Sequence, residues 1–475
     1  MNFHLKSNNI PLIMIECKKL DRVRSEYCML SYSDIIKDLL GIQDKNIIIE
    51  DNCKSEEVIN GIRTHIIDAK LIGEPSANHC CTDCEHSHII KHGFLATYCL
   101  LPKPSSQLKT LLRLRKQRWF CKSCKATSIS TTPLVDYRCT ISNPLKMHIF
   151  HDATKKRSEV EIAYDNGVSN VSVNRIVNAI YEEKQVRLDY LPEVLCFDEF
   201  KSTKDAKGAM SFIFCNADNG KIIDILEERT LEYLKGYFRR FTLEARKGVK
   251  EIVIDMYSAY MSLINSLFPN AKIVTDRFHI VQLISRALNK TRIKIMNTLQ
   301  HTDEKAYRKL KRYWKLLLKY SEDLDDFEYK FFWCFAGKKT TQKKVVEEIL
   351  TINEQLRISY EFYQELIHAI KTKNPERLTR ALQTLPKNIS DYLKTSAETL
   401  IAYLPSVTAA LETKYSNGIL EGIINQIKVI KRIAFGYRSF VRFKARILMI
   451  HEYNPIKIAR KKKQKEKEQS KLIPI

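Results

Sequence analysis

The sequence lacks any apolar run that approaches the roughly 20 residues needed to cross a bilayer. Near its start, residues 10–15 form only a short apolar patch with no credible cleavage site, so we expect a cytoplasmic chain with no membrane partner. Acidic residues are scarce: 55 Asp and Glu against 79 Lys and Arg give a formal net charge of +24. This excess favours a polyanionic partner, with a membrane surface as the weaker alternative.

The cysteine pattern also argues against a disulfide framework. The thirteen cysteines are an odd number, and nine of them precede residue 130. Two CxxC turns, Cys81/Cys84 and Cys121/Cys124, can present four thiolates to one tetrahedral Zn²⁺. We therefore predict a structural zinc finger over residues 76–130 in a reducing compartment. A nearby histidine in place of one cysteine, and a redox CxxC, are the alternatives.

Residues 150–185 have the pattern of two helices joined by a tight turn. Ser158 and Glu161 are spaced as a capping box, and Asn166-Gly167 ends the first helix. Apolar residues then recur at helical spacing, as in a helix-turn-helix; an ordinary helical hairpin is the alternative. In a helix-turn-helix the start of the second helix faces the major groove. The residues expected there are Asn170, Ser172, Asn174 and Arg175.

Two apolar stretches in the second half of the chain end in a carboxylate. The residues before Asp198 and the β-branched residues before Asp255 predict buried strands. A predicted helix over residues 419–431 carries Glu421, Asn425 and Lys428 on one face. Two strand-borne aspartates and a helix-borne glutamate suit two Mg²⁺ or Mn²⁺ ions and phosphoryl transfer. Taken alone, Asp255 can equally cap the helix after it.

The order of elements after residue 190 predicts an α/β domain. Three strands followed by alternating strands and helices over residues 190–280 is the order of an RNase H-like sheet, with Asp198 and Asp255 on its first and fourth strands. A helical insertion is expected over 281–412, its aromatic residues forming a core rather than stacking on bases. The predicted strands cover residues 194–198, 211–216, 222–227, 251–255 and 271–274.

Three further segments complete the predicted organisation. Residues 1–75 are expected to form a small α/β segment without chemistry of its own. Residues 413–450 complete the α/β domain, and their mixture of basic and aromatic residues suits a nucleic-acid backbone. Residues 451–475 form a lysine-rich, polar tail that we expect to be disordered. The basic residues expected to contact DNA are Lys428, Lys431 and Arg432.

Over roughly residues 33–450 the chain resembles the transposases of the ISL3 family of bacterial insertion sequences. Besides the CxxC pairs and the predicted helix-turn-helix, the resemblance rests on FDEF at 197–200, IDMYSAY at 254–260, FPNAKIVTDRFHI at 268–280 and SNGILEGIINQIKVIKRIAFGYRSF at 416–440. It implies a multidomain α/β protein with an RNase H-like core and a DDE triad of Asp198, Asp255 and Glu421. The implied partners are double-stranded DNA, as terminal inverted repeats and target, and further copies of the chain in a homodimer or higher oligomer. The implied location is the bacterial nucleoid.

One residue departs from the family's pattern. Ile424 stands where the family's EGxNN motif has its first asparagine, which predicts the loss of a polar contact beside Glu421. Asn425 is expected to be accessory, and Asp276 either assists metal or DNA positioning or caps the next helix. The alternatives to a transposase are a catalytically inactive or domesticated DNA-binding protein and a structure-specific nuclease that cuts without joining.

Overall fold

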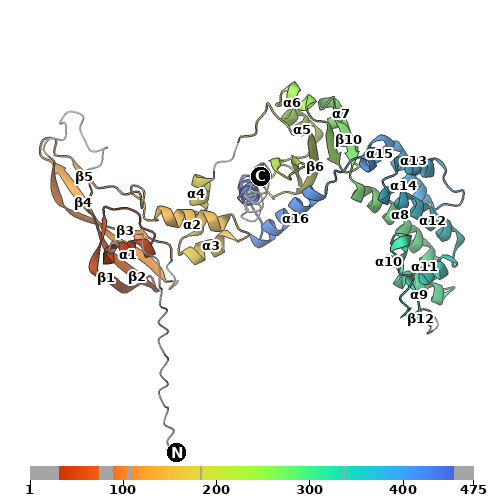
Figure 1. Ribbon diagram of the computed structural model, residues 1–475, viewed down its shortest axis with the longest axis horizontal. Helices are drawn as coiled ribbons and strands as arrows, with labels where there is room; N and C mark the ends of the chain where they lie inside the picture. The colour runs from red at the N-terminus through yellow and green to blue at the C-terminus, as the bar shows by residue number, and fades with distance from the viewer. Residues whose placement is uncertain are drawn as a thin grey trace, which may run out of the picture. The chain divides into compact units, whose positions relative to one another are not determined.

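The computed structural model describes residues 31–73, 89–103, 108–181, 185–335, 337 and 339–453 (Figure 1). Two compact units make up the chain, Met1–Ile149 and Phe150–Ile475, and each is described by itself. The protein is a mixed α/β protein, as predicted. Within the described ranges, no helix is long and apolar enough to span a membrane.

The first unit is built on a five-stranded sheet in the order β1–β2–β4–β3, with β5 paired to β4. A tight turn at Asn60-Gly61, where both residues have positive φ, joins β1 to β2 as in a two-residue hairpin. β2 runs parallel to β4, and the other pairs are antiparallel. The elements are α1 (Tyr32–Leu39), β1 (Ile47–Ile59), β2 (Ile62–Leu71), β3 (Ile89–Leu100), β4 (Lys109–Cys121) and β5 (Thr127–Ile129).

A pair of short helices, α3 (Glu159–Asn166) and α4 (Asn170–Ile180), follows α2 (Asn143–Ala153). The predicted capping box at the start of α3 is present, since Ser158 and Glu161 bond to each other's backbone N–H groups. Gly167 adopts a left-handed φ of 63°, which lets the chain turn within three residues. Ser169 then caps α4 by accepting from the backbone N–H of Ser172.

The second unit contains a five-stranded sheet in the order β10–β9–β6–β7–β8. β6, β7 and β8 are antiparallel neighbours, whereas β9 and β10 run parallel to β6. Strands occur at all five predicted places. They are β6 (Val194–Lys201), β7 (Met210–Asn216), β8 (Ile222–Leu226), β9 (Glu251–Ile254) and β10 (Lys272–Thr275).

Helices cover both faces of this sheet. Alternate residues of β6 point to opposite faces, so Phe197 packs with α5 and α7 while Cys196 and Phe200 pack with α16 and α17. The helices of the first face are α5 (Leu231–Phe238), α6 (Leu243–Lys247) and α7 (Ser258–Leu267). Those of the second face are α8 (Arg277–Thr298), α15 (Leu404–Glu412), α16 (Gly418–Ile433) and α17 (Phe440–Glu452).

Between α8 and α15 lies a helical region, as expected. It contains α9 (Glu304–Arg312), α10 (Trp314–Leu317), η1 (Ser321–Asp323), α11 (Gln342–Leu350), α12 (Glu354–Lys371), α13 (Pro375–Gln383) and α14 (Asp391–Ala402), with a two-stranded ribbon of β11 (Lys330–Phe331) and β12 (Lys339–Thr340). The expectation that its aromatic residues form a core holds for Tyr320, and Tyr313 and Phe332 pack against the same core while partly buried. It is wrong for four others, Phe327, Tyr329, Phe331 and Trp333, which are exposed to solvent.

Candidate active site

Three aspartates lie at one level of three adjacent parallel strands: Asp198 within β6, Asp255 directly after β9 and Asp276 directly after β10. Cys196 of β6 lies opposite Val253 of β9, so Asp198 and Asp255, each two residues farther on, reach the same level. β10 continues in register with β9 and brings Asp276 to that level too. Because side chains alternate along a strand, all three aspartates point to the face that α16 covers. The fold therefore gathers carboxylates that are far apart in the sequence.

Asp198 lies in a partly buried position. One carboxylate oxygen, Oδ1, accepts a hydrogen bond from the backbone N–H of Glu199 at 2.7 Å. The other, Oδ2, accepts from the side-chain amide of Asn417 at 3.4 Å. Burial raises the pKa of Asp198 to about 7, and the neighbouring charge of Asp255 acts in the same direction. Asp198 therefore titrates near neutrality unless a cation stabilises its ionised form.

His279, in the first turn of α8, lies between two of the aspartates. Its Nδ1 atom is 3.0 Å from Asp255 Oδ1 and 3.2 Å from Asp276 Oδ2. The carboxylate of Asp255, followed by that of Asp276, raises the pKa of His279 to about 10, so the imidazole is cationic at neutral pH. The contact with Asp255 has ion-pair distance without hydrogen-bond geometry. Within the described residues, the buried Asp255 Oδ1 thus accepts no hydrogen bond.

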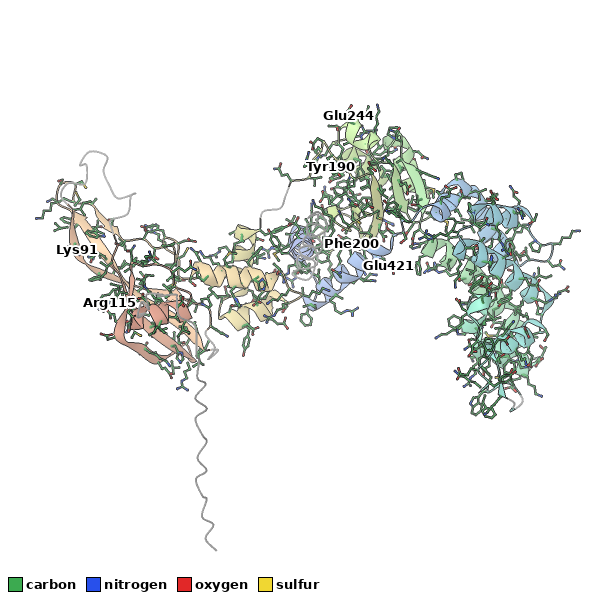
Figure 2. The ribbon with its side chains drawn as sticks, in the orientation of Figure 1. Lys91, Arg115, Tyr190, Phe200, Glu244 and Glu421 are labelled. Atoms are coloured by element: carbon green, nitrogen blue, oxygen red, sulfur yellow. The ribbon has the colours of Figure 1, made fainter. Side chains whose placement is uncertain are left out.

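Asn417, immediately before α16, fastens that helix to the strand ends. Its backbone N–H donates to Asp276 Oδ1 at 3.1 Å, and its side-chain amide donates to Asp198 Oδ2 and to the carbonyl of Phe197. The backbone N–H of Glu421 donates to the Asn417 carbonyl at 2.8 Å. Glu421, labelled on α16 in Figure 2, therefore lies one helical turn after Asn417, a buried residue that contacts two of the aspartates.

Asn417 was not among the residues predicted for the site. The signal that could have found it is the Asn-Gly pair at the start of a predicted helix, where a polar side chain is usually explained as a cap. Here the side chain makes no cap hydrogen bond with its own helix and bonds to the sheet instead. The role expected for Asp276 as a helix cap is similarly incomplete: it precedes α8 but makes no side-chain cap hydrogen bond.

The donor set suits a divalent cation. Carboxylate oxygens are the ligands that Mg²⁺ prefers, and Asp255 Oδ1 is buried with no hydrogen bond within the described residues. Asp198, beside it, carries a raised pKa that a cation would lower. In the described ranges, the His, Cys, Asp and Glu side chains form no group of three that is close enough to hold a metal ion in this conformation. His279 supplies the positive charge next to Asp255 in this arrangement.

The exposed face of α16 carries the predicted polar residues. Glu421, Asn425, Lys428 and Arg432 are exposed, and Lys428 Nζ lies 3.4 Å from Asn425 Oδ1. Lys431 instead donates to the backbone carbonyls of Lys201 and Ser202, which ties α16 to the end of β6. Ile424 is buried in the core with Leu420, Ile423 and Ile427. The isoleucine that departs from the family's pattern therefore faces the core.

The other predicted binding residues lie on α4. Asn170 and Arg175 are exposed, whereas Ser172 and Asn174 are half-buried and bond locally, to Ser169 and to Asn178.

Only half of the predicted zinc site falls within the described residues. Cys81 and Cys84 lie outside them. Cys121 ends β4, and the chain then turns back tightly: Lys125 N–H donates to the Cys121 carbonyl, and Cys121 N–H donates to the Ala126 carbonyl. Cys121 is buried and Cys124 half-buried. The second CxxC therefore forms a closed turn at the end of a strand.

Residues 195–447 match the sequence model of a family described as transposase, the ISL3 group of DDE transposases. The match begins in β6, ends in α17 and includes Asp198, Asp255 and Glu421. It covers more than half of the chain. The chain belongs to the ISL3 family of transposases.

Two curated relatives extend the comparison. The transposase for insertion sequence element IS1001 of Bordetella parapertussis is 29% identical over 252 residues, which cover 52% of this chain and 58% of that protein. A protein of Lactococcus lactis subsp. lactis named ATP-dependent protease is 37% identical over 115 residues, covering 23% of this chain and 36% of that protein. The matched part of this ISL3-family transposase thus spans somewhat over half the length of the Bordetella transposase and about a third of the length of the Lactococcus protein.

Proposed function

We propose that this transposase binds the terminal inverted repeats of an ISL3-type insertion sequence and catalyses metal-dependent DNA cleavage and strand transfer. The observation that carries the proposal is that Asp198 and Asp255 lie at the same level of adjacent parallel strands, and that Asn417 links the start of α16 to Asp198. The sheet order supports an RNase H-like core, since three antiparallel strands are followed by two parallel ones. Asp198, Asp255 and Glu421 are the proposed catalytic residues.

The same three carboxylates would hold Mg²⁺ or Mn²⁺, which when bound stabilises the attacking and leaving oxygens of a phosphodiester. Asp198 must lose its proton to take part; burial raises its pKa in the metal-free protein, and a bound cation would lower that pKa and favour the ionised form. Asn417 orients the Asp198 carboxylate, and the His279 cation holds the carboxylate of Asp255. Water attacks the phosphodiester at the transposon end and breaks it into a 3′-OH and a 5′-phosphate. That 3′-OH then attacks a phosphodiester of the target strand, forms a new phosphodiester with the target's 5′ side and releases the target's 3′-OH. Neither step needs a covalent protein–DNA bond.

DNA recognition is assigned to the segments before the core. We propose a Zn²⁺ finger over residues 76–130, ligated by Cys81, Cys84, Cys121 and Cys124, and a helix-turn-helix over 150–185. The exposed start of α4 and the three-residue turn before it support the second assignment. The cysteines in the closed turn after β4 support the first. The transposase would act on the bacterial nucleoid as a dimer or higher oligomer.

The test is an incubation of the purified protein with labelled DNA that carries the element's own end, in Mg²⁺ and in EDTA. We expect Mg²⁺-dependent cutting at the end and joining to target DNA. Glu421→Gln and Asp255→Asn should bind the end and fail to cut it. Asp391→Asn, whose side chain is 87% exposed on α14, is the matched control and should cut normally.

Three results would contradict the proposal in different ways. An Asp255→Asn protein that still cuts DNA would remove that residue from the catalytic set. Tight end binding without cleavage in Mg²⁺ or Mn²⁺ would favour an inactive or domesticated DNA-binding protein. Cutting without joining would favour a structure-specific nuclease.

A further inference from the structure

The segment between η1 and α11 exposes four aromatic side chains. Phe327, Tyr329, Phe331 and Trp333 are 93%, 54%, 67% and 84% exposed, at alternate positions of the chain. Single exposed apolar residues are ordinary, but a run of large aromatic rings left in water usually marks a binding surface. The neighbouring Phe335 is buried in the core, so the segment itself is anchored.

Basic side chains lie over these rings. Lys344 Nζ is 5.4 Å from the ring centre of Tyr329, Lys339 Nζ is 5.6 Å from that of Phe331, and Arg312 Cζ is 5.6 Å from that of Trp333. In the part of the chain that the structure describes, none of these three cations forms an ion pair with a carboxylate. Their charges are therefore available to an anionic ligand beside exposed π faces.

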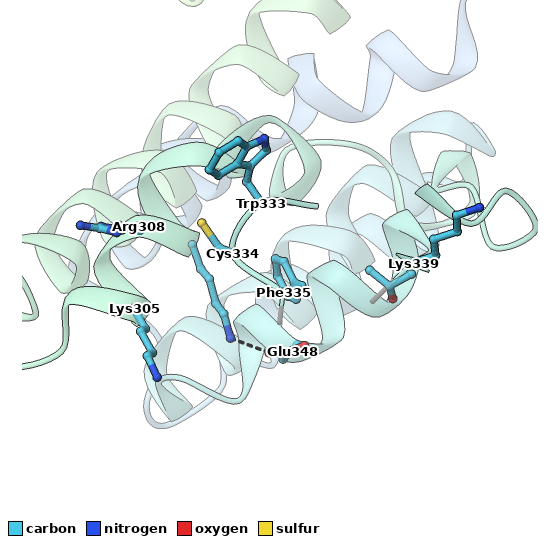
Figure 3. Close-up of a pocket in the computed structure, with 9 residues that line it drawn as sticks. Lys305, Arg308, Trp333, Cys334, Phe335, Lys339 and Glu348 are labelled. Carbon is cyan, nitrogen blue, oxygen red and sulfur yellow. Dashed lines mark hydrogen bonds and ion pairs between the residues drawn. The ribbon is translucent and has the colours of Figure 1, made fainter. Parts of the chain in front are cut away.

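A pocket of about 560 Å³ adjoins this segment (Figure 3). Trp333 and Phe335 line it between the cations of α9 and Lys339, as the close-up shows. Lys305 and Arg308 reach it from α9. Its lining includes a single carboxylate among the described residues, Glu348, which accepts from Lys309. The pocket thus combines an exposed indole with an excess of positive charge.

We infer that this pocket binds unpaired nucleotides of DNA, with a base stacked on Trp333 and phosphates held by Lys305 and Lys339, and by Arg308, which also pairs with Glu304 on its own helix. Every base offers a π face to an aromatic ring once it leaves the helical stack, and cations neutralise the backbone. Duplex DNA keeps its bases stacked on one another, so it would leave the indole in water. An acidic peptide would use the cations and not the rings. The inference rests on the proposed function, because strand cleavage and transfer leave unpaired nucleotides beside the cut ends.

The full-length protein can be tested by fluorescence anisotropy with a labelled single strand of about 12 nucleotides, long enough for one stacking groove. The same strand with abasic sites keeps the phosphates and removes the bases. We expect the wild-type protein to bind the normal strand about tenfold more tightly than the abasic strand, the effect of losing one base–aromatic stack. Trp333→Ala should abolish this preference, and Trp333→Phe should restore most of it.

Two controls keep the test specific. Because Trp333 is 84% exposed, its removal takes away little packing, and the melting temperature should stay unchanged. Tyr392→Ala removes another exposed ring that has a cation near it, Lys290 at 5.8 Å, and should leave single-strand binding as it is. Lys305→Gln should weaken binding of the normal and abasic strands alike and reduce the salt dependence by about one ion.

Equal binding of the normal and abasic strands by the wild type, or an unchanged preference in Trp333→Ala, would overturn the inference. Competition by polyglutamate as strong as that by the single strand would do the same. Binding and cleavage of a blunt duplex that carries the terminal repeat distinguish failure of this inference from failure of the proposed function. If duplex binding and cleavage persist without any preference for bases in the single strand, only the pocket assignment falls. If base-dependent binding persists without cleavage, the proposed function falls and the pocket assignment stands.

Discussion

Replacing Asp198 by asparagine should abolish DNA cleavage and at the same time stabilise the metal-free protein at alkaline pH. The Asp198 carboxyl has a pKa of about 7 in the folded chain, against an ordinary value of 3.8. Because the folded state binds this proton more tightly, the free energy of unfolding falls as pH rises from about 4 to about 7. The loss above pH 7 is on the order of 4 kcal/mol. Asparagine is neutral at every pH, so the variant does not undergo this loss of stability.

The assay is a thermal melt of Asp198→Asn and wild type in EDTA across pH 4 to 9. We expect the two melting temperatures to diverge with rising pH up to about pH 7, and the variant to melt roughly 5 °C higher at pH 8. Added Mg²⁺ should raise the wild-type value and narrow the gap. Asp51→Asn, at an exposed position on β1, is the charge-matched control and should show no such divergence. A difference that stays constant between pH 4 and 8 would refute the electrostatic reasoning.

Three further predictions concern single buried side chains. Arg446→Ala should lower the free energy of unfolding, measured in a melt, by roughly 2–3 kcal/mol, because this buried guanidinium donates to backbone carbonyls just before α3. The control is Arg442→Ala, on the exposed side of α17, which should leave the free energy of unfolding unchanged. Asn417→Ala should raise the Mg²⁺ concentration needed for cleavage by roughly 10–100-fold with end binding unchanged, and an unchanged Mg²⁺ titration would exclude its orienting role. Ile424→Asn, which restores the family's residue, should cost roughly 1–3 kcal/mol because the amide enters an apolar core, and a gain in melting temperature would contradict this.

Much of the fold could be predicted because its signals are local. The β-branched and apolar runs before Asp198 and Asp255 identified the strands that carry them, and the Ser158–Glu161 capping box identified the start of α3. Helical spacing correctly placed Glu421 and Lys428 on one face of α16, since its other face is apolar and buried.

The remainder depends on contacts between distant residues. Asn417 meets Asp198 only after a long insertion has folded, and no local pattern reports that distance. The ion pair of His279 with Asp255 similarly depends on the register of β10 against β9. Aromatic content alone could not separate the buried Phe335 from the exposed Trp333, because both fit a core and a binding surface equally well.

In the proposed catalytic set, Glu421 lies on a helix late in the chain, so its position would determine when that set is first complete during translation. At roughly 5–20 residues per second, a ribosome needs roughly 10–30 s to pass from residue 255 to residue 421. The segments proposed to bind DNA leave the ribosome well before that glutamate. A chain released early would therefore keep those segments and lack the last carboxylate. Under the proposed function, such a fragment would occupy the element's ends without cutting them and would lower the frequency of transposition.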